Sequence, residues 1–329
     1  MKDVNHIFKS FEGKKIIVIG DVMIDTYIEG KVERISPEAP VPVVNFKDRY
    51  SRLGGAANVA LNIKALGAEP IICTVIGKDD QADLFMKLIN EAQLSPKGIL
   101  QSDERITTTK TRIIGNNQQL LRVDHERSNE ISSSAEFTLI EAVKEYCEKD
   151  EVEVIIFQDY NKGVITPTVI EKIIDFANEK GIKTAVDPKK DNFHAFKNVT
   201  LFKPNLKELK EGTGVDIDMS NRESFLEAVE QIKKGQSPKY TFVTLSEHGV
   251  FINDETENHF IPAFPRQIAD VSGAGDTVIS VASLCLAANV SAANLAKLAN
   301  LAGGLVCEQV GVVSVNKEDL INEAIAVIK

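Results

Sequence analysis

The chain has 329 residues, 43% of them hydrophobic and 26% charged, which is typical of a soluble globular protein with enough apolar side chains for a core. Its net charge is −10 and it contains no basic run, so we expect no nucleic-acid partner. The amino terminus is polar, unlike a signal peptide, and the apolar stretches are too short to span a bilayer. We therefore expect a cytoplasmic protein with no membrane partner.

Four cysteines lie far apart in the chain, at Cys73, Cys147, Cys285 and Cys307. They form no C-x-x-C pair, and no group of cysteines and histidines has the spacing of metal ligands. Because cytosolic chains rarely form disulfides, we expect these thiols to be reduced and mostly buried.

Apolar runs of strand length alternate with helical patterns. The first run, Lys15–Gly20, is continuous and ends in glycine, which indicates a strand buried in a parallel sheet. Similar runs follow at Pro70–Ile76, Val152–Phe157, Lys183–Val186, Val199–Phe202 and Tyr240–Leu245. Helical patterns lie between them at Ala56–Leu66, Ala82–Ala92, Ser134–Cys147, Pro167–Lys180 and Arg222–Lys233. After residue 245 we expect two short strands and then three helices, at Val250–Asn253, His259–Pro262, Gly275–Ala288, Ala292–Gln309 and Lys317–Ile328. This alternation predicts a doubly wound α/β fold, with a mostly parallel sheet and helices on both faces.

Two stretches do not fit the alternation. Tyr27–Arg52 is rich in valine and proline, and residues in Ile106–Asp124 alternate as in strands. We expect both to form a small β-rich lid hinged on the main body. The alternative is a pair of long surface loops, although unstructured loops above about 15 residues are uncommon. The lid would carry exposed strand edges and an apolar face, which favour a homodimer through the lid; that face would comprise Val41, Val43, Ile113 and Leu121.

The strongest local signal is Asp270–Thr277 (DVSGAGDT), in which small residues precede a helical pattern. The first N–H groups of a helix are unpaired and its dipole is positive there, so an anion could approach the backbone of Gly273, Ala274 and Gly275. Such a turn can hold a phosphoryl group during transfer, and Asp276 beside it can accept the proton of an attacking hydroxyl. In isolation, the same residues would fit an ordinary helix-capping turn.

Two other segments place polar groups near expected strand ends. Gly54 and Gly55 open a helix and allow a ligand close to the backbone, while Asn58 can both donate and accept; tight packing alone would also explain them. Asp21 and Asp25 follow the first strand, where open α/β sheets have their ligand crevice. Asp25 could bind two hydroxyl groups, whereas a turn is the better interpretation of Asp21.

The segment Asn205–Glu208 follows an expected strand and begins a helix. An asparagine with a glutamate three residues later is the pattern of a capping box, which needs no further function. Beside a phosphate site, Glu208 could instead orient the water shell of Mg²⁺, because this ion keeps several of its waters.

In this order, the G-G-x-x-N, N-x-x-E and G-A-G-D motifs resemble the ribokinase-like carbohydrate kinases, also called the PfkB family, from Lys15 to about Ser314. The resemblance implies one ATP-dependent kinase domain over residues 1–329, with the lid at 27–52 and 106–124. Five strings are most similar to members that phosphorylate the anomeric hydroxyl of D-glycero-D-manno-heptose 7-phosphate for ADP-heptose and lipopolysaccharide core synthesis: Arg34–Val43, Leu53–Ala60, Asn117–Arg122, Asp187–Lys189 and Val243–Gly249.

The resemblance also implies roles for the residues at the motif positions. Asp276 would be the base, and Gly273, Ala274 and Gly275 the anion hole. ATP would lie along a nucleotide set with Mg²⁺ near Glu208: Asn205, Leu206, Lys207, Glu208, Ser246, Gly249 and Asn300. The sugar hydroxyls would contact Asp25, Gly54, Gly55 and Asn58.

Three basic residues are candidates for the phosphate of the substrate, since arginine and lysine both suit phosphate: Lys110, Arg112 and Lys189. Lys110 and Arg112 are two residues apart on an expected strand and therefore share a face. Ordinary surface charge is the alternative. A monovalent cation such as K⁺ could bind at Asp270, Gly311 and Ser314.

Bifunctional members of the family have a second half, a nucleotidyltransferase marked by an H-x-G-H motif, and none of the five histidines here has that spacing. We therefore expect a stand-alone kinase and a separate nucleotidyltransferase. Two other functions stay open: another ribokinase-like sugar or sugar-phosphate kinase, and a non-catalytic sensor, against which the presence of Asp276 argues. No G-x-G-x-x-G follows the first strand, so the sequence does not support a Rossmann dehydrogenase.

Overall fold

The first strand shows how the main sheet is built. In this computed structural model, which describes residues 4–254 and 257–328, β1 (Lys15–Gly20) is buried along nearly its whole length. Successive side chains of a strand point to opposite faces. Ile16 and Val18 accordingly join one hydrophobic cluster, and Ile17 and Ile19 join another. A continuous apolar run is what a strand covered on both faces requires.

Nine strands of the described residues form the main sheet, in the order β13-β12-β11-β10-β9-β8-β1-β4-β5. Neighbouring strands are parallel except in the β11–β12 and β12–β13 pairs. The bounds of the other eight strands are β4 Glu69–Gly77, β5 Ile99–Ser102, β8 Val152–Gln158, β9 Lys183–Asp187, β10 Leu201–Phe202, β11 Tyr240–Thr244, β12 Val250–Asn253 and β13 Asn258–Ile261. The expected α/β fold with a mostly parallel sheet is confirmed.

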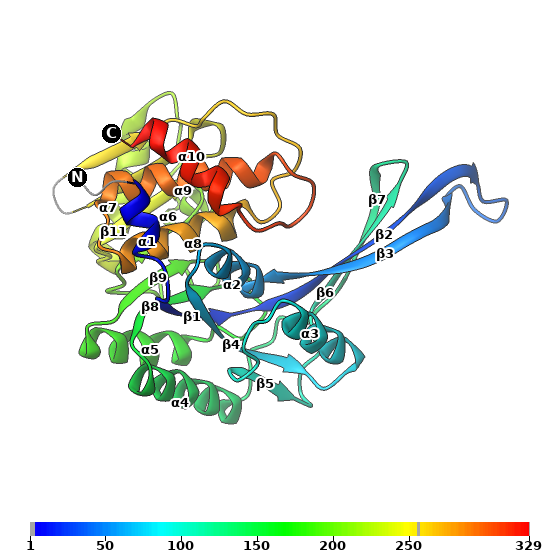
Figure 1. Ribbon diagram of the computed structural model, residues 1–329, viewed down its shortest axis with the longest axis horizontal. Coiled ribbons are helices and arrows are strands. Elements are labelled where there is room, and N and C mark those ends of the chain that lie inside the picture. The colour runs from blue at the N-terminus through cyan, green and yellow to red at the C-terminus, as the bar shows by residue number, and fades with distance from the viewer. Residues whose placement is uncertain (1–3, 255–256, 329) are drawn as a thin grey trace.

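Helices cover both faces of this sheet (Figure 1). One cluster of buried side chains includes residues of α1 Val4–Lys9, α2 Ala56–Ala65, α3 Asp80–Glu91, α8 Ala274–Ala287, α9 Ala292–Cys307 and α10 Lys317–Val327. The other includes residues of α4 Ser133–Lys149, α5 Pro167–Lys180, α6 Leu206–Thr213 and α7 Arg222–Gln236. A short 3₁₀ helix, Ser246–His248, joins β11 to β12.

A separate four-stranded sheet, here called the arm, projects from the body (Figure 1). Its strand order is β3-β2-β6-β7, and the bounds are β2 Val22–Ile35, β3 Pro42–Gly55, β6 Thr109–Gly115 and β7 Gln118–His125. The two stretches that broke the strand–helix alternation lie largely in these strands. The root of the arm is buried, whereas β7 is exposed along its whole length.

The observed bounds differ from the expected ones in a few places. β2 begins at Val22, before the expected start of the lid at Tyr27, so Asp25 lies within this strand. The strand expected at Val199–Phe202 contains only Leu201 and Phe202. α1 and β5 were not expected, because six and four residues are too few to show a period.

The four cysteines are unpaired, as expected. Three of them are buried and Cys147 is half-buried. Among residues 4–254 and 257–328, no helix combines the length and the apolar character needed to cross a membrane.

Candidate active site

Asp276 lies in the first turn of α8 and is only 3% exposed. The helix begins after Gly273, whose φ of 82° lies in the left-handed region that glycine tolerates best. Three donors surround the carboxylate: Asn58 Nδ2 at 2.8 Å from Oδ2, and Gln158 Nε2 at 3.0 Å and Tyr160 OH at 2.6 Å from Oδ1. The glycine turn, Asn58 and Asp276 therefore lie together in the fold.

Burial raises the pKa of Asp276 to about 6, and the nearby charge of Asp187 acts in the same direction. Hydrogen bonds from Asn58 and Tyr160 and the charge of Lys203 oppose this rise. A carboxyl group with a pKa near neutrality can both take up and release a proton in the physiological range. Asp276 thus has the environment of a general base.

Gln158 and Tyr160 were not identified from the sequence. Gln158 is the last residue of β8 and Tyr160 comes two residues later, and their side chains reach Asp276 across 118 and 116 residues of chain. One signal could have found them, since they stand at the carboxyl end of an expected parallel strand, the edge at which open sheets bind ligands.

A buried lysine approaches the glycine turn, and the sequence analysis also missed it. Lys203 is 2% exposed and pairs with Asp187 at 3.1 Å. A Cβ atom built on the exposed Gly275 would lie 4.0 Å from Lys203 Nζ and 3.8 Å from Asp187 Oδ2. The turn therefore combines free backbone approach with a nearby fixed cation, which suits an anionic group.

Lys189 contacts Glu208 and, at 3.4 Å, Asp187. Burial lowers the pKa of Lys189, but the charges of Asp187 and Glu208 outweigh this and raise it, so the ammonium stays charged. The sequence grouped Lys189 with Lys110 and Arg112, but its contacts are with the N-x-x-E segment instead.

Asn205 and Glu208 form a complete capping box at the start of α6, with both hydrogen bonds at 2.8 Å. Asn205 also bridges to Thr244 at the end of β11, next to the turn that carries Ser246 and Gly249. Leu206 and Lys207 occupy the first turn of α6, and Lys207 points into solvent.

Gly249 and Asn300 both lie beside Pro262, just after β13. A Cβ on Gly249 would meet the Ile261 carbonyl and the Pro262 backbone, and Asn300 donates to the Pro262 carbonyl at 2.8 Å. The residues expected around the nucleotide therefore lie at the start of α6 and in the turn after β11, and Asn300 on α9 contacts Pro262, just after β13.

Asp25 is 3% exposed and forms an ion pair with Arg112 from β6. Gly54 lies directly beneath it, because a Cβ there would be 2.2 Å from Asp25 Oδ2. The guanidinium carbon of Arg112 also lies over the Tyr27 ring, 5.4 Å from the ring centroid. The root of the arm thus places a carboxylate and a guanidinium together, and glycine at position 54 is needed for their approach.

Lys110 bonds to Asp124 and Glu126, both at 3.0 Å. Lys162 bonds to the other oxygen of Glu126 at 2.8 Å, so the two lysines share one carboxylate. Lys162 was not identified from the sequence. These cations come from the arm and from the loop that carries Tyr160.

The three residues suggested for a monovalent cation lie around one loop. Asp270 accepts from Ser272 N and Gly311 N, both at 2.9 Å, and Ser314 lies three residues beyond Gly311. Arg52 from the arm donates to the Val312 carbonyl at 2.9 Å. The loop therefore links the glycine turn to the root of the arm.

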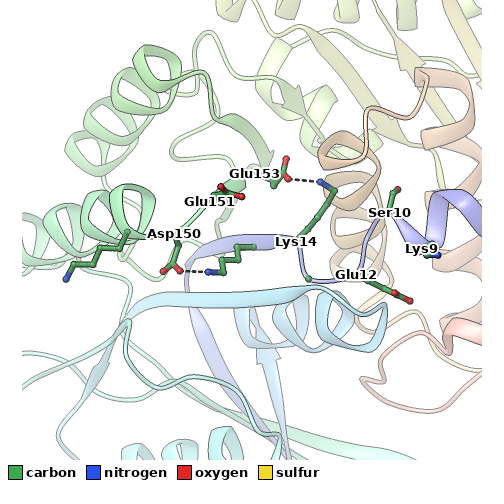
Figure 2. A pocket seen from close by; sticks show the side chains of 10 residues that line it. Lys9, Ser10, Glu12, Lys14, Asp150, Glu151 and Glu153 are labelled. Carbon is green, nitrogen blue, oxygen red and sulfur yellow. Dashed lines mark hydrogen bonds and ion pairs between the residues drawn. The ribbon is translucent and has the colours of Figure 1, made fainter.

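A cleft of about 440 Å³ lies at the amino-terminal ends of β1 and β8, the opposite end of the strands from Asp276 (Figure 2). Its lysines already face acids: Lys14 contacts Glu153 at 2.6 Å, and Lys15 contacts Asp150. Open parallel sheets bind their ligands at the carboxyl edge instead, which is where Asp276 lies.

Solved structures of sugar kinases resemble this chain. Phosphofructokinase-2 from Escherichia coli in complex with potassium has a TM-score of 0.77 and 18% identity, covering 96% of this chain and 99% of that one. Arabidopsis thaliana ribokinase complexed with ribose and ATP has a TM-score of 0.73 and 16% identity, covering 95% and 99%. The chain therefore has the fold of the ribokinase-like kinases.

The family model of the pfkB family carbohydrate kinases matches residues 13–319, and the chain belongs to this family. It is an ATP-dependent carbohydrate kinase. The bifunctional protein HldE of Geobacter sulfurreducens is 35% identical over 97% of this chain, and that of Sulfurimonas denitrificans 38% identical over 95%. The chain covers 65% of the length of each of these two relatives.

Proposed function

We propose that the chain phosphorylates the anomeric hydroxyl of D-glycero-D-manno-heptose 7-phosphate with ATP, giving the 1,7-bisphosphate for ADP-heptose and lipopolysaccharide core synthesis. The observation that carries the phosphoryl transfer is the buried Asp276 carboxylate beside the turn of Gly273–Gly275 and the Lys203 ammonium. The choice of heptose is supported by the five sequence strings and by the similarity to HldE over 95–97% of the chain.

In this proposal Asp276 accepts the proton of the anomeric hydroxyl while its oxygen attacks the γ-phosphorus of ATP. The bond between that phosphorus and the bridging oxygen breaks, and ADP leaves. The backbone of Gly273, Ala274 and Gly275 faces the transferring group, and Lys203 adds a fixed positive charge close to it. Asp25, Gly54, Gly55 and Asn58 would hold the sugar.

The nucleotide would lie over Asn205–Glu208, Ser246, Gly249 and Asn300. Magnesium would neutralise the phosphates when bound. Glu208, and with it the buried Asp187 that shares Lys189, could orient the waters that this ion keeps. A monovalent cation at Asp270, Gly311 and Ser314 belongs to the proposal as well, and the phosphofructokinase-2 with the same fold was crystallised in complex with potassium.

Arg112 and Lys110 are proposed to bind the 7-phosphate, and Lys162 joins them because it shares Glu126 with Lys110. The arm, with the stretches 27–52 and 106–124, would act as the lid of a single kinase domain and as the contact of a homodimer. A nucleotidyltransferase would use the product, and a cytoplasmic location would suit the need for ATP.

A substrate screen tests the proposal. Purified chain with ATP and Mg²⁺ is assayed for ADP release with heptose 7-phosphate, fructose 6-phosphate, ribose and fructose. We expect the highest kcat/KM with heptose 7-phosphate. A higher value with another sugar would replace the heptose and leave the kinase assignment in place, and no ADP release with any sugar would contradict the proposal as a whole.

A further inference from the structure

The oxygens of Asp276 are not equivalent. Oδ1 accepts from both Gln158 and Tyr160, at 3.0 and 2.6 Å, whereas Oδ2 accepts, among the described residues, only from Asn58, at 2.8 Å. Two carboxylate oxygens offer about four acceptor positions in all. Oδ1 is therefore saturated by protein donors, and Oδ2 keeps one position free.

Tyr160 can only be the donor in its bond to Asp276, because an ionised carboxylate has no proton to give. Burial raises the pKa of the Tyr160 hydroxyl well above its usual value, and the charges of Asp276 and Asp187 raise it further. The hydroxyl therefore keeps its proton at any pH at which the enzyme is assayed.

The backbone of the loop that carries Tyr160 is held in place by contacts that do not involve Asp276. The carboxylate of Asp21, 1% exposed, accepts from Tyr160 N, Lys162 N and Val164 N at 2.9, 3.0 and 3.1 Å. Gly163 has a φ of 87°, and a Cβ there would lie 2.1 Å from the Asn129 carbonyl. The position of the Tyr160 hydroxyl is thus set by the fold.

We infer that Tyr160 is a positioning residue: its hydroxyl occupies Oδ1 of Asp276 and so directs the accepting hydroxyl of the substrate to Oδ2. This inference rests on the proposed role of Asp276 as base. The hydroxyl proton passes to Oδ2, on the side of Asn58, whose own Oδ1 is buried and has no partner within the described part of the chain. The Tyr160 bond also favours the ionised carboxylate, against the effect of burial.

Tyr160→Phe tests the inference through the pH profile of kcat/KM. Loss of a donor to the ionised form raises the pKa of Asp276. The fall of kcat/KM on the acid side of the profile, its acid limb, therefore moves to higher pH, by roughly one unit for a charge-assisted bond. The variant should therefore lose less activity, relative to the wild type, at pH values well above the acid limb than at pH values below it. The groups that face Asp276, including Asp187 and Lys203, are unchanged in this variant.

Tyr146→Phe is the matched control, since this tyrosine lies on α4, away from the donors that surround Asp276; its profile stays that of the wild type. An unshifted limb, or an equal loss at every pH, would overturn the inference. If Tyr160→Phe does not fold, Gln158→Leu removes the other donor to Oδ1 and must shift the limb in the same direction. Asp276→Asn separates the two proposals: an active Asp276→Asn variant refutes the base itself, whatever Tyr160 does.

Discussion

At the scale of single residues, the proposed chemistry centres on the Asp276 carboxylate, which the fold both buries and surrounds with donors. We expect Asp276→Asn to lower kcat by roughly 10²–10⁴-fold, the usual contribution of a general base. ATP binding, measured by isothermal titration calorimetry, should persist, because the nucleotide contacts proposed here do not include this side chain. A folded variant that keeps more than about a tenth of the wild-type kcat would contradict the assignment.

The pH dependence follows from the same residue. The proposed base is active when ionised, and the pKa of Asp276 is about 6, so kcat/KM should fall tenfold per unit as the pH drops below about 6. Burial also raises the pKa of Asp159 to about 6, which makes it the alternative source of such a limb. Asp159 accepts from Asn161 N and Asn192 instead of touching Asp276, so Asp159→Asn should leave the limb where it is.

At the scale of elements, strand β6 of the arm carries Arg112, which is proposed to bind the phosphate of the substrate. If Arg112 binds the 7-phosphate, Arg112→Ala should raise KM for heptose 7-phosphate by about tenfold, since a charge-assisted contact contributes about 1.5–3 kcal/mol. Arg122→Ala is the control, because Arg122 pairs with Arg112 in register on β7 but is half exposed. Its KM should stay unchanged.

The ion pair with Asp25 offers a second explanation that the assay must separate. A sugar without a phosphate, if it is turned over at all, should be affected little by Arg112→Ala. Equal losses on both substrates would show that Arg112 holds Asp25 in place and does not bind the phosphate.

The elements also show what the sequence could predict. β1 was found because it is apolar on both faces, and the expected bounds of α5 are the observed ones, with Pro167 at its start and Gly181 directly after its end. The 14-residue strand β2 was harder, because its first six residues are buried and the remainder mostly emerges into solvent, so no single period describes it. A pattern can be recognised only where the environment stays constant along an element.

The same reasoning applies to the site. Asp276, Asn58 and Asn205 stand next to glycines or at helix starts, and local spacing was enough to single them out as candidates. Lys203 and Tyr160 join the site only because strands far apart in sequence end at the same edge of the sheet. No local pattern distinguishes such a lysine from a surface lysine, so tertiary packing was needed to find it.

At the scale of the whole molecule, the arm exposes large apolar side chains far from the body. Phe46 is 68% exposed and Leu121 is 54% exposed, and exposed strand edges are usually paired or covered. We expect light scattering at micromolar concentration to give twice the mass of one chain. Phe46→Asp should shift the protein toward the monomer.

Phe137→Asp provides the matched control for the dimer. Phe137 lies on α4 of the body and is 67% exposed, so it matches Phe46 in size and exposure but not in location. This variant should remain a dimer. A wild-type chain that is a clean monomer at micromolar concentration would contradict pairing through the arm.

The burial of the cysteines has a consequence for covalent labelling. Burial raises the pKa of all four thiols, that of Cys147 to about 12, so the reactive thiolate is scarce at pH 8. The native chain should therefore react slowly with maleimides and with Ellman's reagent. A cysteine introduced by Glu38→Cys, at the exposed tip between β2 and β3, would react much faster. A fluorophore could then report on the arm while all four native thiols remain in place.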